Sequence, residues 1–133
     1  DNYCKAVDIE AQTMVDMARK EILPAVVAYS KELADTLAAK KAAVPGIACK
    51  YETGVVEKLS TLADEIDAAA AALDTELIKL KSITDVTESA NTIRDVILQK
   101  MAELRVVCDE AETLTAEKYW PFPTYSDLLF GVK

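Results

Sequence analysis

The stretch ETGVVEKLSTLADEIDAAAAALDTELIKLK, Glu52 to Lys81, contains no proline and, after Gly54, no glycine. Its apolar residues recur every three or four positions, and this spacing places them along one stripe of an α-helix. The stripe consists of Val55, Leu59, Leu62, Ile66, Ala69, Leu73, Leu77 and Leu80. Charged side chains occupy many of the other positions. The pattern predicts one long amphipathic helix over residues 52–81 that packs its apolar stripe against other helices.

The same spacing continues on both sides of this stretch. Downstream it predicts a helix over about 86–119, whose start is marked by Asp85 and, three residues later, Glu88, as in a capping box. The stripe of that helix is Val86, Ala90, Ile93, Ile97, Met101, Leu104, Cys108, Ala111 and Leu114. Upstream it predicts a helix over about 2–41, with the stripe Val7, Ala11, Met14, Ala18, Ile22, Val26, Leu33 and Leu37.

Pro24 interrupts the first of these helices. Proline has no N–H to donate to the carbonyl of Lys20, and inside a helix it costs about 3 kcal/mol and usually bends the helix. We therefore expect the first helix to be kinked or split near Pro24. The connections at 44–51 (VPGIACKY) and 82–85 (SITD) are short, and short connections join antiparallel neighbours. The expected fold is all-α, an antiparallel up-down-up bundle of three long helices.

The composition fits a single helical domain over residues 1–133. Hydrophobic residues make up 51% of the chain, with only three glycines and four prolines, which favours a helical core over disorder. The net charge of −8 argues against binding nucleic acid or an anionic membrane, because both need Lys and Arg to neutralise phosphate. No apolar run approaches the ~20 residues that a membrane-spanning helix needs. We expect a cytoplasmic protein with no nucleic-acid and no membrane partner.

The chain contains no histidine, and this absence excludes several kinds of site. Ser-His-Asp or Cys-His catalysis, imidazole zinc sites and the Glu-x-x-His ligands of di-iron bundles all require it. The three cysteines, Cys4, Cys49 and Cys108, are odd in number and widely spaced, which fits neither a disulfide framework nor paired metal ligands. We expect them to be small, partly buried residues in a reducing compartment. No catalytic, cofactor-binding or metal-binding residue is predicted in this chain.

The segment YWPFPTYSDLLFGVK, Tyr119 to Lys133, departs from the helical pattern. It holds five of the eight aromatic residues of the chain, and its two prolines end the third helix. Such a density of aromatic residues is typical of a surface that is covered. The candidate interface or lid residues are Trp120, Phe122, Tyr125, Leu128, Leu129 and Phe130. Two alternatives stay open: these residues anchor the domain to a partner, or the tail over 120–133 packs back on its own bundle.

Two stretches of the chain resemble a known family. They are AVDIEAQTMVDMARKEILPAVVAYSKELADTLAAKK, Ala6 to Lys41, and RDVILQKMAELRVVCDEAETLTAEKYWPFPTYSDLLFGV, Arg94 to Val132. Both are similar to the C-terminal region of type III glutamine synthetases. The pieces IEAQTM, ILPA and YWPFPTY are specific in combination, although none of them is a catalytic motif.

The resemblance implies a larger parent enzyme that joins ammonia to glutamate with ATP and Mg, acting as a cytoplasmic oligomer in bacteria. It also implies that the ligands for glutamate, nucleotide and metal belong to a catalytic domain upstream, so the chain itself carries no cofactor. The chain does not begin with methionine, and we expect a C-terminal fragment whose partners are that catalytic domain and neighbouring subunits. The alternative is a free-standing helical adaptor that binds a partner helix in a groove.

Overall fold

The computed structural model of the chain describes residues 2–123. Their elements are α1 (Asn2–Met17), the π-helical turn η1 (Ala18–Ile22), α2 (Leu23–Ala43), α3 (Lys50–Lys81), α4 (Val86–Thr92), a second π-helical turn η2 (Ile93–Ile97), α5 (Leu98–Leu114) and the 3-10 turn η3 (Glu117–Tyr119). No strand occurs among residues 2–123, so the all-α prediction is confirmed. The runs α1–η1–α2 and α4–η2–α5 are continuous, and together with α3 they make three long helical rods.

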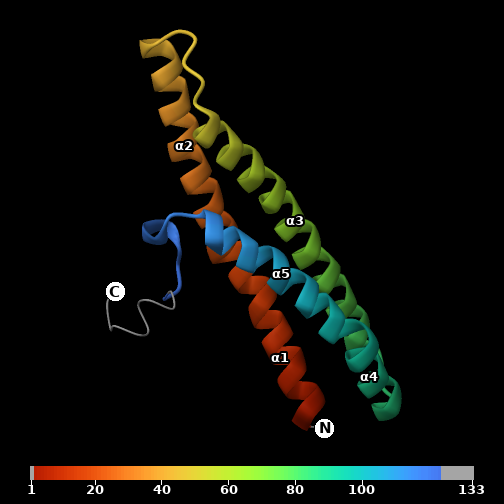
Figure 1. The fold of residues 1–133 in the computed structure, drawn as a ribbon. Coiled ribbons are helices and arrows are strands. Elements are labelled where there is room, and N and C mark those ends of the chain that lie inside the picture. Colours follow the sequence, from red (N-terminus) through yellow and green to blue (C-terminus); the bar gives the residue numbers. More distant parts are fainter. Residues whose placement is uncertain (1, 124–133) are drawn as a thin grey trace.

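The middle rod, α3, holds the other two together. Figure 1 shows the first rod running from the N-terminus to a tip, α3 returning beside α2, and the third rod turning back across α3. α3 packs against α2, α1 and α5. Because α5 ends well before the tip, the part of the molecule near the tip is a hairpin of α2 and α3 alone (Figure 1).

The hydrophobic core follows the length of α3. Leu59, Ile66, Leu73 and Leu77 are at most 1% exposed. Buried residues from the other two rods complete the core, and they are Val7, Ala11, Val15, Ala18, Ile22, Val26, Leu33, Ile93, Ile97, Met101, Leu104, Cys108 and Ala111. The three rods are therefore held together by one contiguous core.

The predicted apolar stripes are buried or half-buried, with one correction and one refinement. Val86 was wrongly included, since its side chain is 62% exposed. It stands in the first turn of α4, next to the largely exposed 82–85 connection. In the alanine run of α3, Ala70 is fully buried and Ala69 only partly so. Both alanines fit the helical spacing between Ile66 and Leu73, and side chains of equal size give no cue to choose between them.

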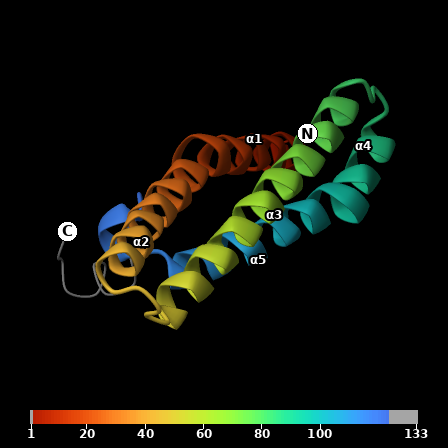
Figure 2. The ribbon, with the colours of Figure 1, turned by 90° about the horizontal axis from the view of Figure 1, so that it is seen from above.

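The disturbance predicted near Pro24 is present as a bend in one continuous rod. In η1 the N–H of Leu23 donates to the carbonyl of Ala18, five residues back. This wider turn lies immediately before Pro24, whose ring would otherwise crowd the carbonyl of Lys20. Figure 2 shows the resulting angle between α1 and α2. The second π-helical turn has the same bond, from the N–H of Leu98 to the carbonyl of Ile93, and no sequence signal predicted it.

The boundaries of the third rod need one correction. Its start is confirmed, because the Asp85 carboxylate accepts a hydrogen bond from the N–H of Glu88 at 2.9 Å. Its end was wrongly predicted at Tyr119, since α5 ends at Leu114 and the backbone of Thr115 is extended (φ −91°, ψ 132°). The extended residues redirect the chain so that Tyr119 reaches α2. This tertiary contact outweighs the local helical preference of the sequence.

The turn between α2 and α3 is flanked by an ion pair in which the carboxylate is buried and the lysine is exposed. Gly46 supplies a positive φ of 89°, and Cys49, with a φ of 47°, precedes α3. Next to this turn the Lys40 ammonium donates to the Glu52 carboxylate, and Glu52 is only 7% exposed. The hydrogen bond from Lys40 lowers the pKa of Glu52 below its ordinary value near 4.5. The same bond raises the pKa of Lys40.

Glu52→Gln is expected to lower Tm at neutral pH and to leave a smaller deficit in acid. The reason is that a carboxyl whose pKa is lowered by folding stabilises the native state above its unfolded pKa, and this contribution is lost as pH falls through the folded value. Thermal unfolding between pH 7 and pH 3 measures the difference between the two proteins. Glu57→Gln, an exposed carboxyl on the same helix, is the control. An equal deficit for Glu52→Gln at pH 7 and pH 3 would contradict a role for the ionised pair.

Candidate functional site

The segment after α5 is fastened to α2 by an aromatic and ionic cluster. The ring of Tyr119 lies against Tyr29, with centroids 5.5 Å apart. The Tyr119 hydroxyl donates to Glu32 Oε1 at 3.1 Å, and Lys118 Nζ donates to the same oxygen at 3.3 Å. Burial raises the pKa of Tyr29, and the neighbouring Tyr51 raises it further. The Tyr29 side chain is therefore neutral at physiological pH, and its tilted contact with the ring of Tyr119 adds apolar packing.

Trp120 and Phe122 continue from this cluster onto the core. Their rings meet edge to face, with centroids 6.5 Å apart and an interplanar angle of 79°. Both side chains are half-buried and pack against the core. They form one wall of a groove of about 260 Å³ between α1 and α5, whose apolar lining is Met14, Met17, Ile22, Leu104, Cys108, Trp120 and Phe122.

The chemistry of this groove suits contact with another surface. Its floor is apolar and includes two methionines, whose flexible thioethers adapt to irregular partners. Charged groups stand at the edge, where Arg105 Nη2 lies 3.9 Å from Met14 Sδ and Asp109 also lines the groove. Burial, helped by the charge of Asp109, raises the pKa of Cys108 to about 11. Its thiol is therefore protonated and unreactive at neutral pH.

The structure brings together two of the six candidate residues, Trp120 and Phe122. The other four, Tyr125, Leu128, Leu129 and Phe130, lie outside the described residues. Sequence reasoning did not find Tyr29 and Glu32, which fasten the segment to α2. They are separated from Tyr119 by about ninety positions, and neither the spacing nor the composition of α2 marks them.

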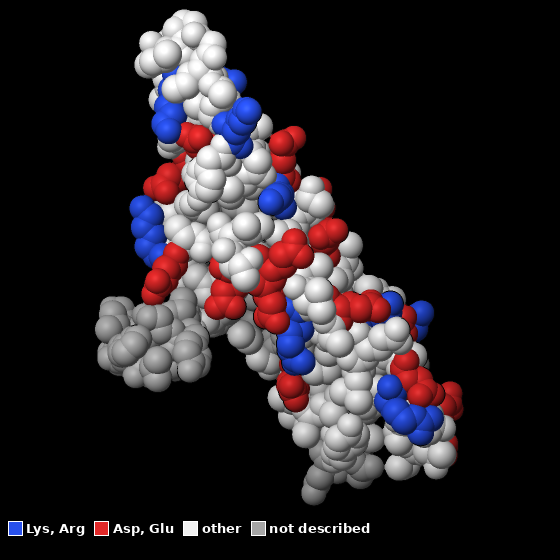
Figure 3. Space-filling view, in the orientation of Figure 1, with Lys and Arg blue, Asp and Glu red and all other residues white. Residues whose placement is uncertain are grey.

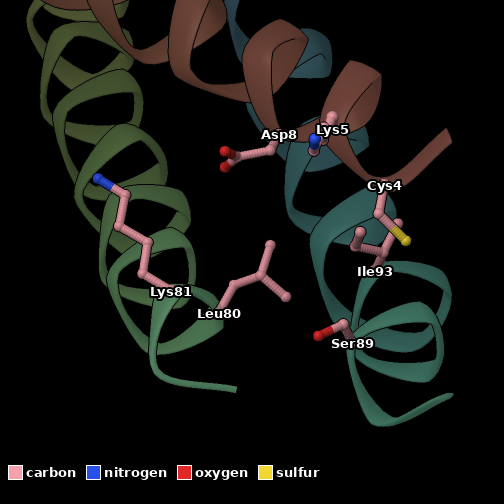
Figure 4. Close-up of a pocket in the computed structure, with 7 residues that line it drawn as sticks. All are labelled: Cys4, Lys5, Asp8, Leu80, Lys81, Ser89 and Ile93. Carbon is pink, nitrogen blue, oxygen red and sulfur yellow. The ribbon is translucent and has the colours of Figure 1, made fainter. Parts of the chain in front are cut away.

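A second, smaller cavity lies at the end of the domain where α1 begins. Figure 4 shows that it is bounded by the first turns of α1, the end of α3, and the third rod at α4 and η2. Its volume is about 150 Å³, and its lining is Cys4, Lys5, Asp8, Leu80, Lys81, Ser89 and Ile93. The cavity therefore combines two ammonium groups, one carboxylate and an apolar wall.

The charges elsewhere on the surface are mixed in sign. On the face shown in Figure 3, acidic and basic side chains are interspersed, with no broad basic patch. No group of three acidic, cysteine or histidine side chains placed to hold a metal ion occurs within residues 2–123. In the same part of the chain, none of the helices has the length and apolar character needed to cross a membrane.

The described residues form an all-helical domain in which an aromatic segment packs beside the core, and the comparisons show which proteins this chain resembles. Residues 1–41 match the family described as the glutamine synthetase C-terminal domain. No solved structure matches the chain. The family match covers the whole first rod as far as the last turn of α2.

Two relatives extend the similarity over the rest of the chain. The chain is 36% identical over 133 residues to a glutamine synthetase of Butyrivibrio fibrisolvens, which covers 100% of this chain and 19% of that protein. It is 27% identical over 137 residues to a type-3 glutamine synthetase of Dictyostelium discoideum, which covers 96% of this chain and 18% of that protein. The resemblance to type III glutamine synthetases is thus confirmed, and the chain spans about a fifth of the length of these curated relatives.

Proposed function

We propose that this chain is the non-catalytic C-terminal helical domain of a larger glutamine synthetase. One observation carries the proposal: relatives with that name align with the whole chain, yet the chain spans only about a fifth of their length. The parent protein would form glutamine from glutamate, ammonia and ATP, with Mg, in the cytoplasm. Glutamate, nucleotide and metal would be held by the part of the parent that lies outside these 133 residues.

The domain would serve structure and assembly as an up-down-up bundle. Trp120 and Phe122, with Tyr125, Leu128, Leu129 and Phe130 further along the chain, would anchor it to the catalytic domain or to a neighbouring subunit. The half-buried rings and the groove beside them support this role, because aromatic residues in water-excluding pockets dominate the energetics of interfaces. The mixed surface charge and the net charge of −8 favour a protein partner over nucleic acid or membrane.

The proposal is tested by comparing the 133-residue chain with the protein read from the complete reading frame. We expect the longer protein to form glutamine in an ATP-dependent and Mg-dependent assay. We expect the 133-residue chain to give no heat of binding with ATP and Mg in calorimetry and to form no glutamine. A start codon directly upstream of Asp1, with no synthetase domain in frame, would overturn the proposal in favour of a free-standing adaptor.

A further inference from the structure

The cavity at the start of α1 contains a carboxylate oxygen that lacks a hydrogen-bond donor. Asp8 Oδ1 is inaccessible to solvent and has no hydrogen-bond partner among the described residues. Figure 4 shows the Asp8 carboxylate pointing from α1 toward the space beside α3. A buried carboxylate oxygen without a donor is costly, since it has lost water and gained nothing in return. Asp8 Oδ1 is therefore free to accept a hydrogen bond from an N–H group or a cation that enters the cavity.

The same cavity also presents two cations without counterions. Lys5 and Lys81 both line it, and neither forms an ion pair within residues 2–123. Leu80 and Ile93, both buried, supply the apolar part of the wall. The arrangement thus offers an acceptor for a positive group, donors for a negative group and a surface for a short hydrocarbon chain.

These three elements together select one class of ligand. A divalent cation would be repelled by the two ammonium groups, and a simple phosphate or sulfate would be opposed by Asp8. A zwitterion instead finds a group of opposite charge in the cavity for each of its own charges: Asp8 for its ammonium group and the two lysines for its carboxylate. The volume of about 150 Å³ sets the size, because cavities of that order hold ligands as large as benzene.

We infer that this cavity binds a small free amino acid with an uncharged side chain. Its α-ammonium group donates to Asp8, its α-carboxylate accepts from Lys5 and Lys81, and its side chain lies on Leu80 and Ile93. Because the cavity joins α1 to α3 and to the third rod, occupancy fastens the first turns of α1 to the rest of the domain. A ligand that binds only this folded arrangement raises the stability of the domain. The inference is independent of the activity proposed for the parent protein.

Calorimetry and thermal unfolding of the 133-residue chain test this with L-norvaline as the probe. We expect saturable binding and a rise in Tm with increasing L-norvaline. Two analogues, pentanoate without the ammonium group and pentylamine without the carboxylate, are expected to bind about tenfold or more weakly, as removal of a charged hydrogen-bonding group predicts. Equal binding of pentanoate would reduce the site to an anion site and overturn the inference.

Three variants locate the binding. Asp8→Asn and Lys81→Ala are each expected to weaken L-norvaline binding about tenfold or more. Asp16→Asn, which changes an exposed carboxyl on α1 away from the cavity, is expected to leave binding unchanged. Lys81 is exposed, so its variant keeps the test decisive even if Asp8→Asn fails to fold. No binding of L-norvaline at millimolar concentration, or unchanged binding in both cavity variants, would overturn the inference.

Discussion

Leu77→Ala in α3 is expected to lower the free energy of unfolding by about 3 kcal/mol, within the range of about 2–5 kcal/mol for buried leucines. The Leu77 side chain is 1% exposed and belongs to the core shared by all three rods. Its removal leaves a cavity that rigid neighbouring helices fill only in part. Urea unfolding followed by circular dichroism measures the loss as a lower midpoint with an unchanged slope.

Ile78→Ala is the matched control for this result. Ile78 is the next residue of α3, yet its side chain is 62% exposed. Its truncation is expected to change the free energy of unfolding by no more than about 0.5 kcal/mol, as at other surface positions. If the two variants lost equal stability, α3 would not present the face to the core that the structure shows.

The double variant Trp120→Ala, Phe130→Ala in the longer protein is expected to weaken assembly by about 2 kcal/mol or more, which is about 30-fold in affinity. Trp120 forms one wall of the groove beside α5, and Phe130 belongs to the apolar end of the chain. Truncating both would remove an indole ring and a phenyl ring from the proposed anchor. Sedimentation over a range of concentrations would detect the loss as a shift toward smaller species.

Tyr3→Ala serves as the control, because Tyr3 is an aromatic residue that is 60% exposed and lies near the N-terminal end of α1. It should leave assembly unchanged. Removal of residues 120–133 from the 133-residue chain separates the two roles of the tail. A small change in Tm would leave the aromatic residues available to a partner, whereas a large loss, together with unchanged assembly of the double variant, would assign them to a lid.

The fold was predictable because its dominant signal is local. Spacings of three and four along α3 identified the face that is buried, and the Asp85 cap marked the start of the third rod. Where neighbouring residues are identical the prediction was less sharp: Ala69 does pack against the core, but Ala70, which has the same side chain, is the more deeply buried of the two. The end of α5 was not predicted either. Thr115 is extended, and the chain after it contacts α2 through Tyr119 and Tyr29, which is a tertiary contact that local sequence does not indicate.

The sequence identified the aromatic residues after α5 as candidates for a contact, but it did not indicate which surface they pack on. The aromatic density singled out Trp120 and Phe122, while their partner surface on α1 and α5 depends on how three rods cross. The cavity at Asp8 gave no sequence signal at all. Its residues come from three separate segments. Leu80 and Ile93 belong to the predicted apolar stripes, whereas Lys5, Asp8 and Lys81 each resemble an ordinary solvated position on a helix.

The contact between Tyr119 and Glu32 also bears on the order in which the domain folds. It joins residues 87 positions apart, and closing so long a loop costs more entropy than forming the α2–α3 hairpin, whose ends are held by the Lys40–Glu52 pair across 12 positions. Contacts between distant residues slow folding, because this entropy is lost before they form. We therefore expect the hairpin to form before the aromatic segment docks, so that Trp120 and Phe122 cover the groove beside α5 only late in folding.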